Sequence, residues 1–227
     1  MAQVDYPLDK SARAPCLVVL LPGRGDDLDA FDKHGFVAAL RARNIQADLV
    51  AADAILGYYA KGTFPERLRE DVVEPLRKRG YRRIWAVGVS LGGLGAALYS
   101  RYNPGVFDGV ILIAPYLGDD AIQEEIRKAG GLARWNPAQA TSHGDERALW
   151  QWLQRTAPQT APGGPRLYLG FGAQDGMASG QQLLAVALPV DHVFETPGGH
   201  DWPVWRTVLG AFVDELAASC SAPPDKQ

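Results

Sequence analysis

Long apolar runs and targeting segments are missing from this sequence, and their absence excludes several classes of protein. No apolar run approaches the roughly 20 residues that cross a bilayer as a helix, so no membrane span is predicted. The N-terminus also lacks the basic and apolar regions of a secretory signal peptide. We therefore expect a cytoplasmic location, with a secreted or periplasmic one if a signal peptide has been removed.

Cysteine is nearly absent, since Cys16 and Cys220 are the only two among 227 residues. Two cysteines are too few for a disulfide framework or for a zinc site, and we expect no metal. We predict two unpaired thiols. A single disulfide between them is the alternative if the two residues meet in the fold.

An excess of charge of one sign is missing as well. The chain has 23 Lys and Arg against 26 Asp and Glu, a formal net charge of -3, which gives no electrostatic reason to expect nucleic acid as a partner. The one basic run, residues 77–83, falls at an expected helix end, where cations complement the helix dipole. The predicted partner is a small molecule, and no signal for an oligomeric state is present.

Short apolar runs alternate with longer amphipathic segments along the chain. This pattern is typical of an α/β protein with a mostly parallel sheet covered by helices on both faces. The expected strands are nearly continuous apolar runs, as in sheets buried on both sides, at residues 16–21, 47–51, 84–89, 109–114, 166–171 and 191–195. Helices are expected near residues 29–42, 65–79, 91–102, 180–187 and 202–218, with a kink at Pro75. We predict a single domain over residues 1–227, with a flexible tail at 219–227.

Residues 116–165 interrupt the alternation with one or two helices and no strand. An insertion at the carboxyl edge of a sheet is a natural lid or pocket wall, and this one is rich in aromatic residues. We predict that aromatic residues of the insertion, of the segment after the second strand and of the last helix line a substrate pocket; packing alone is the alternative for each of them. The candidates are Tyr58, Tyr59, Tyr116, Trp135, Trp150, Trp152 and Trp202.

The most informative motif is Gly-Val-Ser-Leu-Gly at residues 88–92, between an apolar strand and a helix of small residues. Such a pentapeptide holds a serine on a sharp, strained turn with its hydroxyl exposed above the sheet. A serine hydroxyl needs a base before it acts as a nucleophile, so the motif predicts a histidine, an orienting acid and an oxyanion hole. An ordinary glycine-rich turn is the alternative reading of the pentapeptide alone.

Elimination among four histidines selects the base. In this type of sheet the chain order is serine, acid, histidine. His34 precedes Ser90, His143 lies in the insertion, and His192 lies within an expected strand. His200 follows the last strand, in a loop from which it can reach back over the strand ends.

The acid and the oxyanion hole are assigned by position. Asp175 follows an apolar strand and a glycine turn between Ser90 and His200, whereas Asp191 and Asp201 are weaker candidates. The oxyanion hole is expected to use the backbone N–H of Leu91, the residue after the nucleophile, and that of Arg24 in the loop after the first strand. All of these positions follow carboxyl ends of strands, where open α/β sheets bind their ligands.

Three segments together resemble the α/β-hydrolase superfamily, and within it the small serine esterases of the carboxylesterase and esterase D-like groups. They are Leu-Leu-Pro-Gly-Arg-Gly at 20–25, Gly-Val-Ser-Leu-Gly-Gly at 88–93 and Gly-Gly-His-Asp-Trp at 198–202. The resemblance implies hydrolysis of esters or thioesters without a cofactor, with Ser90, His200 and Asp175 as the triad. The family's usual His-Gly is Pro22-Gly23 here, and the few residues before Cys16 predict a reduced sheet of about six strands.

Other functions remain as alternatives. An acyltransferase would use the same scaffold, with an alcohol or amine in place of water. A dinucleotide-binding enzyme fits poorly, because the glycines at 88, 92, 93 and 95 do not have the Gly-x-Gly-x-x-Gly spacing. A non-catalytic binding module with this fold would have no need of the three triad residues.

Overall fold

The computed structural model describes residues 1–136, 146–159 and 164–221. Its centre is a seven-stranded sheet in the order β1-β3-β2-β4-β5-β6-β7. The six strands from β2 onward are parallel, and only β1 runs antiparallel, against β3. The strands are β1 (Gln3–Tyr6), β2 (Cys16–Leu21), β3 (Ala47–Ala52), β4 (Arg83–Val89), β5 (Gly109–Ile113), β6 (Arg166–Gly172) and β7 (Val193–Thr196).

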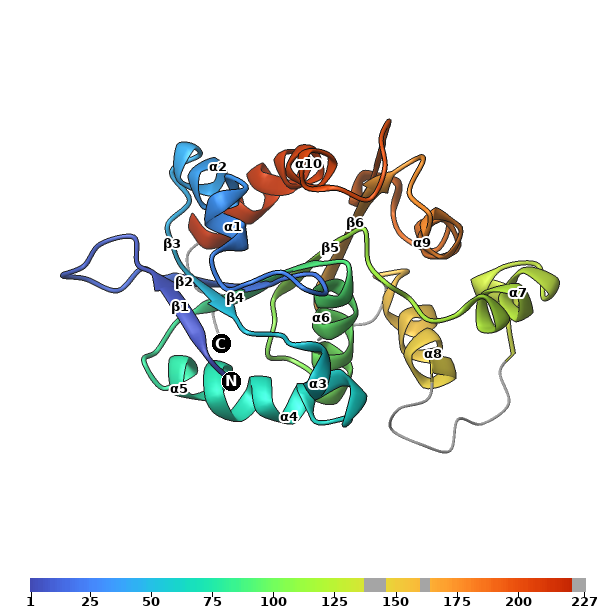
Figure 1. The fold of residues 1–227 in the computed structure, drawn as a ribbon, viewed down its shortest axis with the longest axis horizontal. Coiled ribbons are helices and arrows are strands. Elements are labelled where there is room, and N and C mark those ends of the chain that lie inside the picture. Colours follow the sequence, from blue (N-terminus) through green and yellow to red (C-terminus); the bar gives the residue numbers. More distant parts are fainter. Residues whose placement is uncertain (137–145, 160–163, 222–227) are drawn as a thin grey trace.

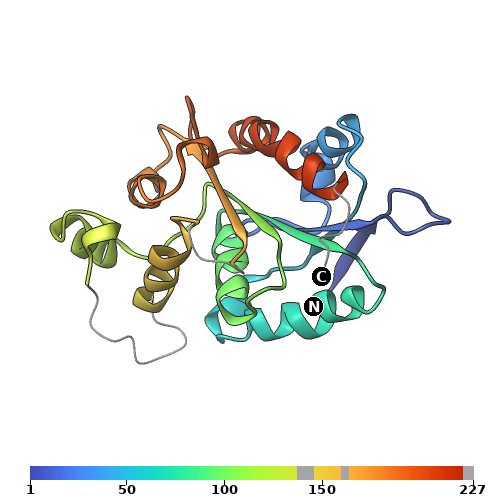
Figure 2. The same ribbon diagram turned by 180° about the vertical axis from the view of Figure 1, so that it is seen from behind.

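Two layers of helices cover the sheet (Figure 1). One layer contains α1 (Ala30–Lys33), α2 (Phe36–Ala42) and α10 (Trp202–Ser221); the other contains α3 (Leu56–Ala60), α4 (Phe64–Leu68), α5 (Glu74–Arg77) and α6 (Leu91–Tyr102). Beyond β5 and β6 lie α7 (Asp120–Lys128), α8 (Glu146–Thr156) and α9 (Ala178–Ala185), which Figure 2 shows from behind. Short helical turns lie at Arg69–Val73, Leu132–Arg134 and Val190–His192. Among the described residues, no helix has the length and apolar character to cross a membrane.

Burial differs between the central strands of the sheet and the strands at its edges. Every residue of β2, β3 and β5 is buried, because helices cover both faces of the central strands. The edge strands β1 and β7 are only partly buried.

The strand order also locates the crevice in which such sheets bind ligands. β2 lies between β3 and β4, so the chain builds the sheet first in one direction from β2 and then in the other. The crevice lies at the carboxyl ends of β2 and β4.

The strand count corrects the sequence prediction of about six strands. β1 adds a seventh, pairing Gln3 to Tyr6 with Ala52 to Leu49. Its four residues are too polar and too short to have been recognised as a strand. Two expected helices are also divided: Gly35, with a positive φ of 78°, separates α1 from α2, and a π-helical turn at Arg69–Val73 precedes Pro75, which lacks the N–H that a regular helix needs.

The prediction of two unpaired thiols is wrong. Cys16, at the start of β2, and Cys220, in the last turn of α10, form a disulfide with their Cα atoms 5.2 Å apart. Both residues are buried, and α10 continues to Ser221, so the expected flexible tail is helical over its first three residues. Residues 222–227 lie outside the described part of the chain. Because a pairing 204 residues apart is a tertiary contact, local sequence gave no signal for it.

Candidate active site

Ser90 occupies a strained turn between β4 and α6. Its φ of 52° and ψ of -114° fall in a region that residues with a Cβ rarely adopt. Its backbone N–H donates to the Ile113 carbonyl of β5 at 2.9 Å, which holds the turn above the sheet. Strain of this kind at a nucleophile turn keeps the hydroxyl exposed instead of packed in the helix.

The glycines around Ser90 let three backbone segments approach one another. A Cβ on Gly88 would lie 2.3 Å from the Gly92 carbonyl oxygen, and one on Gly92 would lie 2.0 Å from that of Leu21. Position 92 must therefore be glycine, because the end of β2 and the loop that follows it lie too close for a side chain. These glycines contact protein backbone, whereas those of a dinucleotide site leave room for a pyrophosphate.

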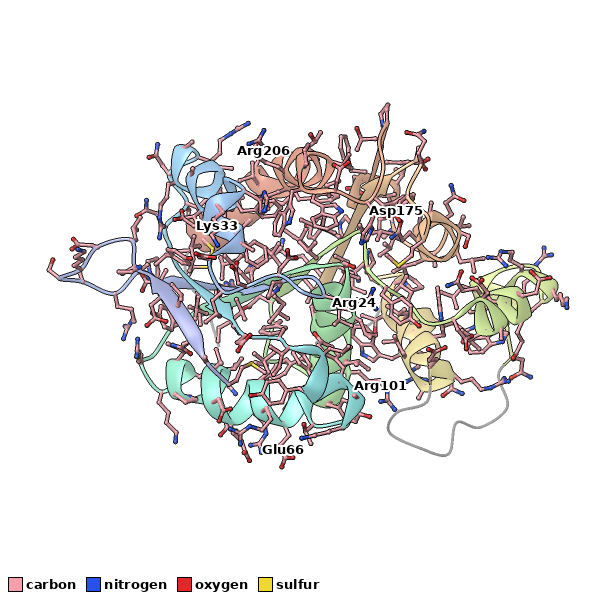
Figure 3. The ribbon with its side chains drawn as sticks, in the orientation of Figure 1. Arg24, Lys33, Glu66, Arg101, Asp175 and Arg206 are labelled. Atoms are coloured by element: carbon pink, nitrogen blue, oxygen red, sulfur yellow. A yellow bond between two sulfur atoms is a disulfide. The ribbon has the colours of Figure 1, made fainter. Side chains whose placement is uncertain are left out.

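His200 connects Ser90 to Asp175. The Ser90 hydroxyl lies 2.9 Å from His200 Nε2, and His200 Nδ1 lies 2.7 Å from Asp175 Oδ2. Asp175 comes from the loop between β6 and α9, where Figure 3 labels it, and His200 comes from the loop between β7 and α10. The two loops meet because Gly172 has no side chain: a Cβ there would lie 2.3 Å from the Gly198 carbonyl oxygen.

Asp175 is held as a buried carboxylate. Its side chain is 0% exposed, whereas that of His200 is 28% exposed. Burial pushes the pKa of Asp175 upward, but the hydrogen bonds from His200, from the Met177 backbone N–H and from Gln181 outweigh burial, and the pKa lies below its usual value. Asp175 is therefore ionised at neutral pH and accepts the Nδ1–H of His200, which leaves Nε2 free to accept the serine proton.

The two expected oxyanion donors lie at the same crevice. The N–H of Leu91 is the first of α6, and a helix leaves its first N–H groups without intrahelical acceptors. Arg24 follows Gly23, whose added Cβ would lie 3.6 Å from the Cβ of Ser90. The N–H of Gly23 is already used by Asp26 Oδ2 at 3.1 Å. Within the described residues neither Arg24 N–H nor Leu91 N–H has a protein acceptor.

A cavity of about 660 Å³ opens over these residues. Ser90, His200, Leu91 and Arg24 all line it, and Figure 3 shows Arg24 near α6. Tyr116 is the one aromatic pocket candidate that lines this cavity. The sequence interpretation missed three of its wall residues, Leu56, Met177 and Trp205, of which Trp205 packs edge-on against the His200 ring at 4.9 Å.

The remaining aromatic candidates do not line this cavity. Trp150 and Trp135 are buried, 0% and 4% exposed, and their indole N–H groups donate to the Leu117 carbonyl and the Glu125 carboxylate. They hold the insertion against the core because a large ring gains most from complete burial. Of the other candidates, Trp202 stacks on His34 at 4.4 Å, Tyr58 and Trp152 are half-buried against the core, and Tyr59 lines a second cavity.

The other histidines have packing roles where the structure describes them. His192 stacks on Tyr168 at 4.2 Å, and its Nδ1 lies 2.8 Å from the Leu167 carbonyl oxygen. His34 packs on Trp202, and His143 lies outside the described residues. Over the described ranges, no group of three or more His, Cys, Asp or Glu residues is arranged to hold a metal ion.

Comparison with known proteins places the fold. No protein-family model matches the sequence, and no curated protein matches it. Solved structures do match: the fluorophosphonate-binding serine hydrolase F of Staphylococcus aureus aligns over 95% of this chain and 98% of its own, with a TM-score of 0.67 and 13% identity. A ferulic acid esterase aligns over 95% and 92%, with a TM-score of 0.65 and 16% identity.

An S-formylglutathione hydrolase from Agrobacterium tumefaciens aligns over 95% of this chain and 88% of its own, with a TM-score of 0.62 and 15% identity. Coverage of nearly the whole chain at these TM-scores indicates a shared fold, although few residues are identical. With its mostly parallel sheet and its serine turn after β4, the chain has the α/β-hydrolase fold.

Proposed function

We propose that this protein is a serine hydrolase that cleaves carboxylic esters or thioesters through an acyl-enzyme. The observation that carries the proposal is the continuous hydrogen-bonded series from Ser90 through His200 to the buried Asp175, with distances of 2.9 and 2.7 Å. A serine, a histidine and a carboxylate in this order activate the serine for acyl transfer. The geometry of the three side chains supports that chemistry.

In the proposed reaction, Ser90 Oγ attacks the carbonyl carbon while His200 Nε2 takes the hydroxyl proton. Asp175 stabilises the imidazolium that forms, because it is ionised and accepts the Nδ1–H. His200 then gives the proton to the departing alcohol or thiol, which leaves Ser90 acylated. Water attacks the acyl-enzyme as His200 takes one of its protons, and the carboxylic acid is released with the Ser90 hydroxyl restored.

The negative charge on the substrate oxygen needs donors that are in place before the reaction. We assign this role to the backbone N–H groups of Leu91 and Arg24, which lie on either side of the crevice between β4 and β2. Because both donors are backbone groups, the side chain of Arg24 is not needed to stabilise the negatively charged oxygen. The names of the similar structures, which include esterases and a thioester-type S-formylglutathione hydrolase, agree with the ester or thioester class proposed here.

Labelling with a fluorophosphonate tests the proposal, since this reagent modifies an activated serine. We expect the wild type to be labelled, Ser90→Ala to be unlabelled, and Ser90→Ala to lose at least about 10³-fold in turnover of a short acetyl ester. Ser100→Ala is the matched control, because Ser100 lies on the same helix and its buried hydroxyl donates to the Ala96 carbonyl. Labelling that persists in Ser90→Ala, or fails in the wild type, contradicts the proposal.

The same preparation separates hydrolysis from acyl transfer. With a simple alcohol added as acceptor, a hydrolase releases mainly the free acid, whereas an acyltransferase releases mainly the new ester. Both enzymes would be labelled, so the product ratio decides between them. We expect the free acid to predominate.

A further inference from the structure

Residues 23–26 form a tight turn shortly after the end of β2. The backbone N–H of Asp26 donates to the Gly23 carbonyl oxygen at 3.3 Å, and Gly25, the third residue of the turn, has a φ of 87°. A four-residue turn with a positive φ at its third position is typical of type II, which favours glycine there. Arg24, the second residue of the turn, lines the cavity of the candidate active site.

This turn sets the direction of the Arg24 N–H. A trans peptide is planar, so its C=O and its N–H point in opposite directions. The peptide that joins Gly23 to Arg24 is trans, and its carbonyl accepts the Asp26 N–H. The Arg24 N–H therefore points out of the turn, and within the described residues it donates to no protein acceptor.

The side chain of Asp26 holds the first residue of the turn a second time. Its Oδ2 accepts the Gly23 N–H at 3.1 Å, so Gly23 is bound to Asp26 through both its N–H and its C=O. The two residues lie close together, since a Cβ on Gly23 would lie 2.8 Å from the same oxygen. Without the carboxylate, Gly23 would be bound to Asp26 only through the 3.3 Å backbone bond.

Trp202 holds the other oxygen of this carboxylate. Its indole Nε1–H donates to Asp26 Oδ1 at 3.4 Å. The indole is packed among other rings: His34 stacks on it at 4.4 Å, and Phe31 and Phe36 meet it edge-on at 5.5 and 5.2 Å. Because both phenylalanines are buried, the indole has little freedom to turn. Its N–H is therefore a fixed point for the Asp26 carboxylate.

The same end of α10 also contacts the expected base. His200 lies two residues before Trp202, and the ring of Trp205 lies edge-on to both, at 4.9 and 5.0 Å. α10 itself packs on the sheet beside α2 (Figure 1). The start of α10 thus contacts His200 through one indole and the turn after β2 through the other, by way of Asp26.

We propose that Asp26 is a positioning residue of the oxyanion hole. It holds the Arg24 N–H toward the site of the developing charge, and Trp202 ties it to the start of α10. The proposal rests on the proposed serine hydrolase function and adds a residue that acts through the Arg24 N–H. A donor of this kind is effective when it is in place before the charge develops. Since the ester oxygen gains its charge in the transition state, the effect falls on the rate and not on ground-state binding.

Asp26→Ala removes both side-chain contacts. We expect kcat for a short acetyl ester to fall about 10- to 100-fold, less than the roughly 10²- to 10³-fold loss of a whole oxyanion donor, with KM unchanged within about threefold. Asp26→Asn keeps an acceptor for the Gly23 N–H and is expected to restore kcat to within about fivefold of the wild type. Asp27→Asn is the matched control, because it removes a charge from the same loop and its exposed carboxylate pairs with Lys33 at 2.9 Å.

Two ketone inhibitors distinguish positioning from a general loss of structure. With a trifluoromethyl ketone, Ser90 Oγ bonds to the ketone carbon, the hydroxyl proton passes to His200 Nε2, and the π pair of the C=O becomes the oxyanion. The corresponding methyl ketone binds without this step. We expect Asp26→Ala to weaken the trifluoromethyl ketone about 10- to 100-fold and the methyl ketone less than about twofold. Equal weakening of both ketones overturns the positioning role.

Trp202→Phe tests the connection to α10, because it keeps an aromatic ring and removes the N–H. We expect kcat to fall about 2- to 5-fold, the range of one hydrogen bond at the weaker end. In the Asp26→Ala background the same change should cause no further loss, since the carboxylate that accepts this N–H is gone. Losses that multiply in the double variant overturn the connection.

The outcomes keep the two proposals separable. A wild type that is neither labelled by the fluorophosphonate nor inhibited by the trifluoromethyl ketone overturns the serine hydrolase proposal, and the role of Asp26 with it. Full labelling and turnover in folded Asp26→Ala leave the hydrolase proposal standing and overturn the positioning role. Unfolding temperatures identify any variant that does not fold. If Asp26→Ala is one, the ketone pair on Trp202→Phe decides, and we expect the loss to be confined to the trifluoromethyl ketone.

Discussion

The backbone N–H of Tyr116 donates to the carbonyl oxygen of Ser90 at 3.1 Å. This bond joins the segment leaving β5 to the turn that carries Ser90. Ala114, just before it, has a positive φ of 45°, and a Cβ on Gly93 would lie 2.8 Å from Pro115. The serine turn is thus held from the β5 side, while Gly92 allows the loop after β2 to approach it closely from the other side. Tyr116, which anchors the turn, also lines both the cavity over Ser90 and the second cavity, which Tyr59 lines.

Replacing His200 with alanine is expected to reduce ester turnover by at least about 10³-fold, because in the described part of the chain His200 is the base hydrogen-bonded to the Ser90 hydroxyl. His192→Ala is the matched control, since His192 packs on Tyr168 near the start of β6. We expect it to lower the unfolding temperature and to retain activity per folded molecule. Comparable kinetic losses in two folded variants would refute the assignment of the base.

Asp175→Asn preserves the size of the side chain and removes its charge. The amide no longer fixes the tautomer of His200 or stabilises the imidazolium, so we expect kcat to fall by about 10³- to 10⁴-fold at neutral pH. Asp201→Asn is the control, because Asp201 is exposed and accepts from the Val204 N–H at the start of α10, a role that asparagine also fills. A mild effect of Asp175→Asn in steady-state kinetics would remove it from the triad.

The same glycine-to-alanine change should have opposite effects at two sites. At Gly92 the new Cβ would lie 2.0 Å from the Leu21 carbonyl oxygen, so the β2 loop must move, at a cost of about 1–3 kcal/mol or more and with loss of fluorophosphonate labelling. At Gly210, on the exposed face of α10, nothing lies within 4 Å, and alanine should stabilise by about 0.5–1 kcal/mol. Urea denaturation measures both free energies.

The raised pKa of Tyr81 predicts that the folded protein loses stability at alkaline pH. Its hydroxyl donates to Asp48 at 2.8 Å, and burial together with this carboxylate raises the pKa of Tyr81 to about 12 from an ordinary value of 10.0. An acid whose pKa is higher in the folded state contributes stability that is complete below its unfolded pKa and is lost as pH rises through the interval between the two. We therefore expect this contribution to disappear between about pH 10 and pH 12.

Tyr81→Phe provides the comparison. It lacks the titrating group, so the difference in unfolding free energy between wild type and variant should be constant below pH 10 and shrink above it. Asp48 also accepts the N–H groups of Leu8 and Ala14, so the wild-type bond helps to fix the loop between β1 and β2. A difference that does not change with pH would show that the hydroxyl does not titrate as assigned.

Local sequence predicted the elements that depend on local chemistry. The strand before Ser90 and the small-residue helix after it follow from apolar runs and from glycines that only this turn requires. The chain order was enough to select His200 and Asp175, and the structure brings both within hydrogen-bond distance of their neighbours. Their catalytic roles stay predictions.

Features that depend on contacts distant in sequence were not predictable. β1 is defined by pairing with β3 more than 40 residues later, and the disulfide by the packing of α10 on the sheet, which brings its last turn to the start of β2. For Trp150, composition could not distinguish a pocket wall from a buried anchor, because both roles suit a large ring. Leu56, the first residue of α3, and Met177, just before α9, carry no motif and line the cavity only because those helices begin there.

The disulfide turns most of this chain into a covalent ring. Cys16 and Cys220 enclose Ser90, Asp175 and His200 and the described strands after β1. A single proteolytic cut in any loop between them leaves the two pieces joined, so the nicked protein migrates as one band without reductant and as two with it. Both sulfurs are buried, and reductant should reach them only after α10 detaches from the sheet. The release of the fragments therefore reports the opening of the last helix.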